Sequence, residues 1–151
     1  MEITEVYQKY RNSVYRLAVT YLKSAGDAED ICHDVFIRYV RNKDRVREGS
    51  EQAWLLKVTA NMCRDVLRSY KRHRTEPLDE ELPAPGDDLS YVLDAVMSLP
   101  VRERTAVYLY YYEGRCTDEI ARITGTTRTS VTTRLSRARK KLKDILEDCH
   151  D

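Results

Sequence analysis

The sequence predicts an all-α protein, made of two small helical domains joined by a flexible acidic linker. Apolar residues recur at spacings of three and four along most of the chain, the period of an amphipathic helix. No strand-like alternation extends beyond a few residues. One segment rich in proline and acidic residues interrupts the pattern and disfavours regular structure. We therefore expect an N-terminal helical bundle over residues 1–74, a linker over 75–88 and a C-terminal helix-turn-helix domain over 89–151.

The first domain is expected to begin with two helices. The first ends where Gly26 and Asp27 interrupt its apolar period, and its stripe comprises Ile3, Val6, Tyr7, Tyr10, Val14, Leu17, Ala18 and Tyr21. The second runs from Asp27 to Arg41, with acidic residues suited to a helix N-terminus. Its apolar stripe comprises Ala28, Ile31, Cys32, Val35, Phe36 and Tyr39.

A charged loop and a third helix follow. The apolar period is lost from Asn42 to Ser50, and Ser50 is suited to cap the next helix. One side of that helix is expected to hold Trp54, Leu55, Val58, Met62 and Val66. Its remaining surface is basic, with Lys57, Arg64, Arg68, Lys71 and Arg72.

The second domain shows the pattern of four helices. Residues 89–97 can form a short helix, and Pro100 suits the first position of another that ends near Gly114. Thr117 can cap a helix over residues 118–124, and Gly125 provides a sharp turn. The last helix begins near residues 127–129, with an inward stripe of Val131, Leu135, Ala138, Leu142 and Ile145. The tyrosines Tyr108, Tyr110, Tyr111 and Tyr112 are expected to form a packing surface between helices.

Charge is unevenly distributed, although the net charge is only +1. Residues 1–74 hold 15 Lys and Arg against 10 Asp and Glu, residues 75–94 hold none against 7, and residues 95–151 hold 11 against 8. Two basic segments around an acidic one suit two surfaces for a polyanion joined by a connector that repels it. Ordinary solvated helix faces explain the same charges equally well.

The cysteines and the N-terminal sequence bear on the compartment. The four cysteines are widely spaced and form no C-x-x-C pair, so neither a zinc knuckle nor a redox motif is indicated. The chain shows no apolar signal region or membrane span. We expect a reduced, cytoplasmic protein without membrane insertion.

The second half of the helix-turn-helix is strongly basic. Residues 128–143 include seven Lys and Arg and no Asp or Glu. In such a motif the start of the second helix reaches base edges, while nearby basic residues neutralise phosphates. The residues expected to face the groove are Arg128, Thr129, Ser130, Thr132, Thr133 and Arg134. A solubilising or RNA-binding basic helix is the alternative.

The first domain offers a weaker nucleic-acid signal. Trp54 and Asn61 lie on a basic helix, and Arg45 and Arg47 lie in the loop before it. Aromatic, amide and guanidinium groups together can hold unstacked bases and their backbone. A single Trp in an amphipathic helix is more often a core residue.

No arrangement typical of catalysis is readable from the sequence. It contains no phosphate-cradling glycine loop, no H-E-x-x-H motif and no nucleophile with its base. His33 and Cys32 are adjacent, so on a helix they point about 100° apart and cannot share a tetrahedral ion. We expect no catalytic residue, metal, cofactor or small-molecule substrate.

Several short motifs resemble those of one known family. They are Ala28-Glu29-Asp30 followed by Phe36, Trp54-Leu55 with Asn61 and Asp65, Leu99-Pro100, Glu119-Ile120-Ala121 and Arg137-Ala138-Arg139. Their order and spacing are similar to those of bacterial sigma factors of the extracytoplasmic-function (ECF) group, within the sigma-70 family. The resemblance covers nearly the whole chain, and each half matches independently. It implies a transcription initiation subunit that joins core RNA polymerase and directs it to promoter DNA.

The resemblance also implies which residues meet each partner. The first domain would bind the polymerase clamp through its second helix and would open and read the minus-10 element. The second would read the minus-35 element. Core-polymerase contacts would fall on Asp30, His33, Asp34, Ile37 and Arg38. Minus-10 contacts would fall on Arg45, Arg47, Ser50, Lys57, Asn61, Arg64 and Arg68, with Trp54 mostly a packing residue. Minus-35 contacts would add Arg137 and Lys141 to the six groove-facing residues.

Four positions differ from the usual family pattern. His33 stands where glutamine is usual, and Glu51 where an aromatic residue is common before the tryptophan. Thr129 and Thr132 stand where glycine and a basic residue are usual. Members of this family are often held inactive by an anti-sigma factor, which is therefore an expected partner. A stand-alone helix-turn-helix regulator is the alternative, in which the first domain would sense a ligand or dimerise.

Overall fold

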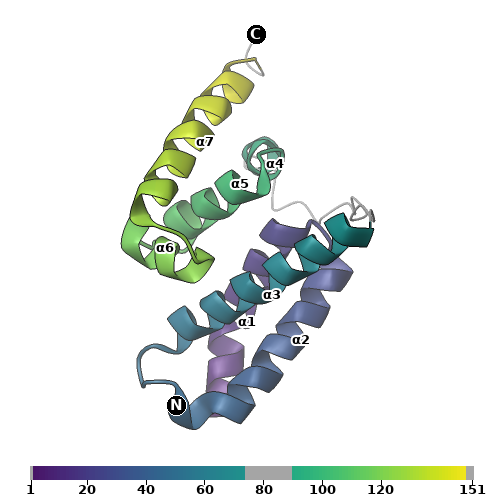
Figure 1. Cartoon of the computed structure of the whole chain (residues 1–151), viewed down its shortest axis with the longest axis vertical. Helices are drawn as coiled ribbons and strands as arrows, with labels where there is room; N and C mark the ends of the chain where they lie inside the picture. Colours follow the sequence, from purple (N-terminus) through teal and green to yellow (C-terminus); the bar gives the residue numbers. More distant parts are fainter. Residues whose placement is uncertain (1, 74–89, 149–151) are drawn as a thin grey trace. The chain divides into compact units, whose positions relative to one another are not determined.

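The computed structural model describes residues 2–73 and 90–148, and every regular element in these two ranges is helical (Figure 1). The expected all-α fold class is confirmed. Helices α1 to α3 belong to one compact unit, and α4, α5, α7 and most of α6 belong to a second. The linker expected over residues 75–88 lies outside the described residues. Within the described ranges, no helix is both long and apolar enough to span a membrane.

The first unit is a bundle of three long helices, α1 (Ile3–Leu22), α2 (Ala25–Asn42) and α3 (Glu51–His73). A short 3-10 turn, η1 (Lys43–Arg45), follows α2. Each helix packs on the other two, because each carries one apolar stripe that needs cover. The fully buried large side chains of this core are Val6, Val14, Leu17, Leu22, Val35, Leu55 and Leu56.

The break between α1 and α2 falls earlier than the sequence suggested. Gly26 was expected to interrupt the helix, but it lies inside the first turn of α2. The chain turns instead at Lys23, whose φ of 54° is left-handed, and Lys23 N–H donates to the Val19 carbonyl at 2.8 Å. The Ser24 hydroxyl then accepts the Asp27 N–H at 3.2 Å and caps α2. A glycine in the sequence indicates a possible left-handed turn, whereas nothing in the sequence indicates that a lysine adopts one.

The buried face of α3 also differs from the expected stripe. Leu55 is fully buried as expected, but Trp54, Val58, Met62 and Val66 are only half-buried. The buried positions are Glu51 in the first turn and then Leu55, Leu56, Thr59, Ala60 and Cys63. The Thr59 hydroxyl donates to the Leu55 carbonyl at 2.7 Å, which lets a polar residue occupy the core. The stripe is therefore rotated relative to the one that hydrophobicity alone selects.

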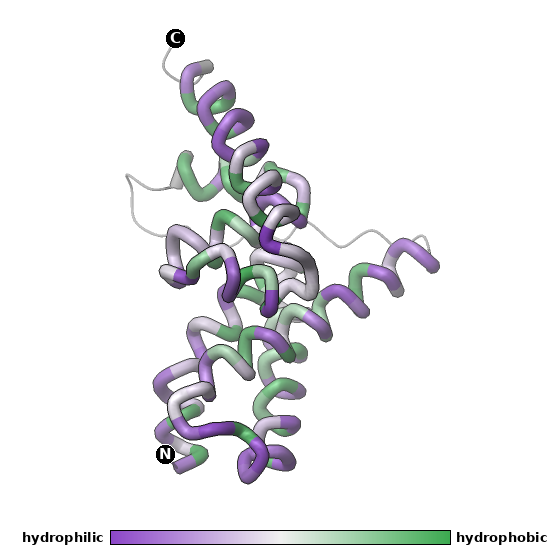
Figure 2. The backbone as a smooth tube through the Cα atoms, turned by 60° about the vertical axis from the view of Figure 1, so that its left-hand side comes forward, coloured by the Kyte–Doolittle hydropathy of each residue, from purple (hydrophilic) through white to green (hydrophobic). Residues whose placement is uncertain are grey.

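The second unit consists of α4 (Ser90–Met97), α5 (Val101–Val107), a wider π-helical turn η2 (Tyr108–Tyr112), α6 (Thr117–Thr124) and α7 (Arg128–Asp148). Helix α7 packs on α4 and α5. Hydrophilic and hydrophobic residues alternate turn by turn along α7 (Figure 2). The core of this unit comprises Ala95, Val96, Leu99, Ala106, Val107, Leu109, Ile120, Val131, Leu135 and Ala138.

Two expected helix ends in this unit are shifted by one residue. Pro100 precedes α5 as its capping residue, and its carbonyl accepts the Arg104 N–H at 2.9 Å. Thr117 is the first residue of α6 rather than its cap, so Cys116 occupies the capping position. Gly114 ends η2 as expected: its φ is 67°, and across it Arg115 N–H donates to the Leu109 carbonyl at 2.9 Å.

The tyrosine cluster forms the expected packing surface only in part. Tyr108 is buried and donates a hydrogen bond to Glu113 at 2.6 Å. The next three tyrosines, Tyr110, Tyr111 and Tyr112, are 37%, 55% and 54% exposed. Consecutive side chains point in different directions around the widened turn, so Tyr108 and Leu109 fill the core and the others face outward.

Candidate nucleic-acid and partner interfaces

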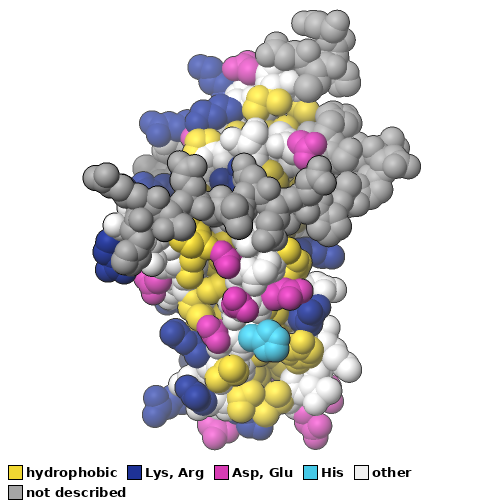
Figure 3. All heavy atoms as spheres, turned by 90° about the vertical axis from the view of Figure 1, so that its right-hand side faces the viewer, with side chains coloured by type: hydrophobic (Ala, Val, Ile, Leu, Met, Phe, Trp, Pro, Cys, Tyr) yellow, Lys and Arg dark blue, Asp and Glu magenta, His cyan; other side chains and the backbone are white. Residues whose placement is uncertain are grey.

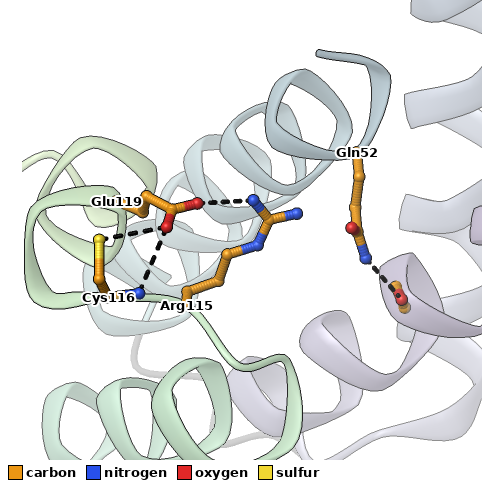
Figure 4. A network of polar contacts seen from close by, with 5 residues as sticks. Gln52, Arg115, Cys116 and Glu119 are labelled. Carbon is orange, nitrogen blue, oxygen red and sulfur yellow. Dashed lines mark hydrogen bonds and ion pairs between the residues drawn. The ribbon is translucent and has the colours of Figure 1, made fainter. Parts of the chain in front are cut away.

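The start of α6 is fixed by Glu119, one turn into the helix. Its carboxylate accepts the Cys116 backbone N–H at 3.4 Å and the Cys116 thiol at 3.1 Å, as in a capping box (Figure 4). Arg115 Nη1 lies 2.7 Å from the other carboxylate oxygen. The hydrogen bonds from Arg115 and then Cys116 lower the pKa of Glu119, so the carboxylate stays charged. The first helix of the motif therefore has a well-defined N-terminus.

The turn between α6 and α7 is short and held by backbone and hydroxyl groups. Gly125 has a φ of 71°, a conformation that favours glycine, and Thr126 N–H donates to the Ala121 carbonyl at 2.9 Å. Thr127 caps α7: its Oγ1 accepts the Ser130 N–H at 3.1 Å and donates to Ser130 Oγ at 3.0 Å. This arrangement is a helix-turn-helix, as the sequence predicted.

Most of the sequence-predicted groove residues lie on the exposed side of α7. Arg128, Thr129, Thr132, Thr133 and Arg137 are exposed, whereas Ser130 and Arg134 are half-buried. The buried residues Val131, Leu135 and Ala138 define the opposite side. Thr132 donates to the Arg128 carbonyl at 3.0 Å, and Arg128 Nε lies 3.8 Å from Asp118 on α6. The geometry thus places hydroxyl and guanidinium groups together on one outward face, the arrangement that base reading requires.

Two basic residues further along α7 contact the rest of their own unit. Lys141 Nζ lies 3.0 and 2.9 Å from the two carboxylate oxygens of Glu103 on α5. Arg139 Nε donates to the Tyr111 hydroxyl at 2.8 Å, and its guanidinium lies 5.5 Å from the Tyr110 ring centroid. Sequence reasoning missed both contacts, since the partners are distant in the chain. Lys141 remains a predicted DNA contact, but its ammonium already has an acidic partner.

The predicted minus-10 residues of α3 share one face of that helix. Their spacing of four, three and four residues brings them into line along the helix, and they are Lys57, Asn61, Arg64 and Arg68. All are exposed except Arg64, which is half-buried and donates to the Asn61 side chain. Arg45, Arg47 and Ser50 are exposed in the preceding loop. The face combines cations with an amide, as a single-strand binding surface does.

Trp54 lies at the edge of the first unit's core. It is half-buried, and its ring meets the buried Tyr39 ring edge to face, with the centroids 5.8 Å apart. This packing agrees with the structural role expected for Trp54. The aromatic contact joins the start of α3 to the end of α2, and the loop over residues 43–50 lies between those two ends.

The outer face of α2 is mixed acidic and apolar. Its five sequence-predicted contact residues, Asp30, His33, Asp34, Ile37 and Arg38, are all exposed. Ile37 is 48% exposed, and Val40, which sequence reasoning missed, is 47% exposed. Magenta acidic side chains lie beside yellow hydrophobic ones on this side of the first unit (Figure 3). Exposed apolar side chains among charges are typical of a protein-binding surface.

Two families of known proteins match the two parts of the chain. Residues 6–73 match the family described as Sigma-70 region 2, and residues 89–142 match the family described as Sigma-70, region 4. SigM of Bacillus subtilis, an ECF RNA polymerase sigma factor, is 30% identical, and the alignment covers 96% of this chain and 95% of SigM. SigE of Mycolicibacterium smegmatis, also an ECF sigma factor, is 33% identical over 94% of this chain. The chain spans 60% of the length of SigE.

Solved structures show the same fold. The sigma factor RpoE of Bartonella quintana, crystallised with the anti-sigma factor NepR, matches with a TM-score of 0.82 and 22% identity, over 95% of this chain and 96% of RpoE. CnrH, solved with the cytosolic domain of CnrY, matches with a TM-score of 0.70 and 22% identity, over 97% of this chain and 88% of CnrH. At this level of identity the two likenesses bear on the fold alone.

Proposed function

This chain belongs to the sigma-70 family, in its ECF group of sigma factors, and from that premise we propose that it directs core RNA polymerase to a particular set of promoters. The observation that carries the proposal is the pairing, in one chain, of a helix-turn-helix with a separate unit that has both an α2 partner face and an α3 basic face. We assign no catalytic step to the chain, because in this function the polymerase makes the RNA.

We propose that the second unit reads the minus-35 element with α7. Exposed hydroxyls and guanidinium groups near the helix N-terminus can hydrogen-bond base edges in the major groove. Three of them, Thr129, Thr132 and Thr133, are threonines, whose methyl groups can also meet a thymine methyl. The preferred sequence of this promoter element is therefore expected to depend on short side chains as well as on Arg128 and Arg134.

We propose that the first unit has two contact surfaces. The α2 face would bind core polymerase, since it combines Asp30 and Asp34 with exposed apolar side chains. The loop after α2 and the basic face of α3 would bind the minus-10 element, where the amide of Asn61 and the neighbouring cations suit an unstacked strand. Placing both surfaces on one bundle would let polymerase binding fix the position of the strand-opening face.

The test is transcription in vitro by core RNA polymerase with and without the purified chain, with the transcript starts sequenced. We expect a distinct set of starts that share two sequence elements. Asp30→Ala with Asp34→Ala should weaken binding to core polymerase, whereas Glu5→Ala, an exposed carboxylate on α1, should not. A chain that binds DNA but fails to bind core polymerase would be a stand-alone regulator, and the proposal would be wrong.

We also propose that an anti-sigma protein binds this chain. The structurally similar sigma factor RpoE was solved with the anti-sigma factor NepR, and the structurally similar CnrH was solved with the cytosolic domain of CnrY. Affinity purification of the tagged chain from its own cells, followed by mass spectrometry, would identify such a partner. The partner should suppress transcription in vitro at stoichiometric amounts. A co-purifying protein that leaves transcription unchanged would not be an anti-sigma factor.

A further inference from the structure

A buried carboxylate lies at the first position of α3. Glu51 is only 4% exposed, although acidic residues are rarely buried unless a donor satisfies them. Its Oε2 accepts the backbone N–H of Gly49, two residues earlier, at 3.0 Å. The negative charge also lies at the N-terminus of a long helix, where the helix dipole favours it. The carboxylate therefore joins the loop to the helix that follows it.

The loop residue that Glu51 holds has an unusual backbone. Gly49 has a φ of 88°, which side chains with a Cβ rarely adopt. Next to it, Ser50 N–H donates to the Arg47 carbonyl at 2.9 Å, which closes a tight turn. An unpaired amide in such a turn would be free to rotate toward water. The bond to Glu51 instead fixes the turn in one orientation.

The buried carboxylate also lies near Tyr39, an aromatic residue of the first unit's core. Tyr39, on α2, is buried, and burial raises the pKa of its hydroxyl; the nearby Glu51 charge raises it further. Tyr39 also contacts Trp54, one turn along α3 from Glu51. Glu51 is thus buried in the first turn of α3, next to the point where the Tyr39–Trp54 pair joins α2 to α3.

We propose that Glu51 is a positioning residue for promoter opening, which rests on the proposed minus-10 role of this loop. By holding Gly49, the carboxylate fixes the loop over residues 43–50 so that Arg45 and Arg47 are presented in one arrangement. A loop that is already ordered loses less conformational entropy when it binds a displaced DNA strand. Glu51, being buried, acts through the loop rather than by touching DNA.

The first experiment measures loop order without polymerase or DNA. Trypsin can cleave after Lys43, Arg45 and Arg47, all exposed in this loop, and the rate of cleavage reports how often the loop opens. Glu51→Met keeps the length and the helix propensity but removes the acceptor, and should raise the rate about tenfold. Glu51→Gln keeps an acceptor oxygen and should stay within about twofold of the wild type. Glu48→Met, which removes an exposed carboxylate of the same loop, is the control for cleavage.

The second experiment measures promoter opening by core polymerase with each variant. Glu51→Met should open the promoter about tenfold more slowly, while its affinity for core polymerase stays unchanged because α2 is untouched. Glu51→Gln should restore the opening rate. Gly49→Ala tests the same contact from the loop side: a Cβ would meet nothing within 4 Å but is strained at this φ, so cleavage should rise and opening should slow. If Glu51→Met does not fold, Gly49→Ala and Glu51→Gln provide the test of the positioning role.

Each result has a separate meaning. Wild-type cleavage rates in Glu51→Met and Gly49→Ala would overturn the proposed contact. Faster cleavage with a wild-type opening rate would show a contact that serves structure only, and would equally overturn the positioning role. If the wild-type chain does not bind core polymerase, the proposed function fails, whereas the cleavage result still describes the loop.

Discussion

Replacement of Lys141 by alanine should destabilise the second unit, before any effect on DNA is considered. Glu103 lies on α5 with only 10% of its side chain exposed, and Lys141 Nζ is 2.9 Å from its carboxylate. Removing the ammonium leaves a nearly buried carboxylate without this partner. Breaking an ion pair that is fully buried on both sides costs several kcal/mol of stability. Because the Lys141 side chain is 47% exposed, water can partly replace it, and we expect a smaller loss of about 1.5 kcal/mol.

Hydrogen exchange of the full chain, read by mass spectrometry, measures this loss locally. Peptides from α5 and α7 should exchange about tenfold faster in Lys141→Ala, while peptides from α1 to α3 serve as the internal reference. Lys143→Ala removes an exposed lysine two residues away and is the matched control. Glu103→Gln in the Lys141→Ala background should recover part of the protection against exchange. A buried neutral amide without a partner costs less free energy than a buried carboxylate without one.

The double-mutant cycle gives the decisive number. The cycle compares Lys141→Ala, Glu103→Gln and the double variant. If Lys141 and Glu103 are coupled as the distances indicate, the destabilisation of the double variant is smaller than the sum of the two single effects by at least about 1 kcal/mol. Equal exchange in Lys141→Ala and Lys143→Ala would refute the argument. Lys141 would then be one more solvated cation, available to phosphate as the sequence predicts.

Three further predictions follow from other residues. Arg134→Ala should weaken binding to the preferred minus-35 sequence by about 1–3 kcal/mol and change the base preference; equal weakening on all sequences, measured by fluorescence anisotropy, would remove its base-reading role. Ser24→Ala should reduce the free energy of unfolding by about 1 kcal/mol in urea, since the hydroxyl caps α2, and a change of less than a few tenths would contradict that role. Iodoacetamide should label exposed Cys116 before Cys63, because burial raises the pKa of Cys63 to about 12; mass spectrometry of the native chain showing early labelling of Cys63 would contradict this burial.

Much of the fold could be predicted because helical periodicity survives small errors in boundaries. The all-α class, the helix-turn-helix and the inward stripe of α7 depend on many residues each, so one misplaced cap does not change them. The errors concern single residues whose conformation the composition does not reveal. Lys23 adopts a left-handed turn beside a more obvious glycine, and Thr59 enters the core by bonding its own helix backbone.

For the candidate interface residues, the exposure was predictable from the sequence, whereas the contacts with the rest of the chain were not. Exposure of Asp30, His33 and Arg128 follows from the face of the helix on which each lies. By contrast, the partner of Lys141 is 38 residues away in the sequence. No local pattern distinguishes it from Lys140 or Lys143. For Glu51 the sequence shows only a carboxylate where an aromatic residue is common, and neither its burial nor its bond to Gly49 has a local pattern.

These contacts change how the charge of α7 should be interpreted. Of the seven basic residues at positions 128–143, Lys141 pairs with the Glu103 carboxylate and Arg128 with the Asp118 carboxylate, which leaves at most five whose charge is fully available to phosphate. The logarithm of the DNA-binding constant falls linearly with the logarithm of the salt concentration, and each phosphate neutralised on duplex DNA contributes about 0.9 to the steepness of that slope. The slope due to α7 should therefore not exceed about 4.5, rather than the value of about 6 that all seven would give. Composition overstates the electrostatic contribution of this helix, so more of its selectivity depends on the hydroxyl and guanidinium groups near its N-terminus.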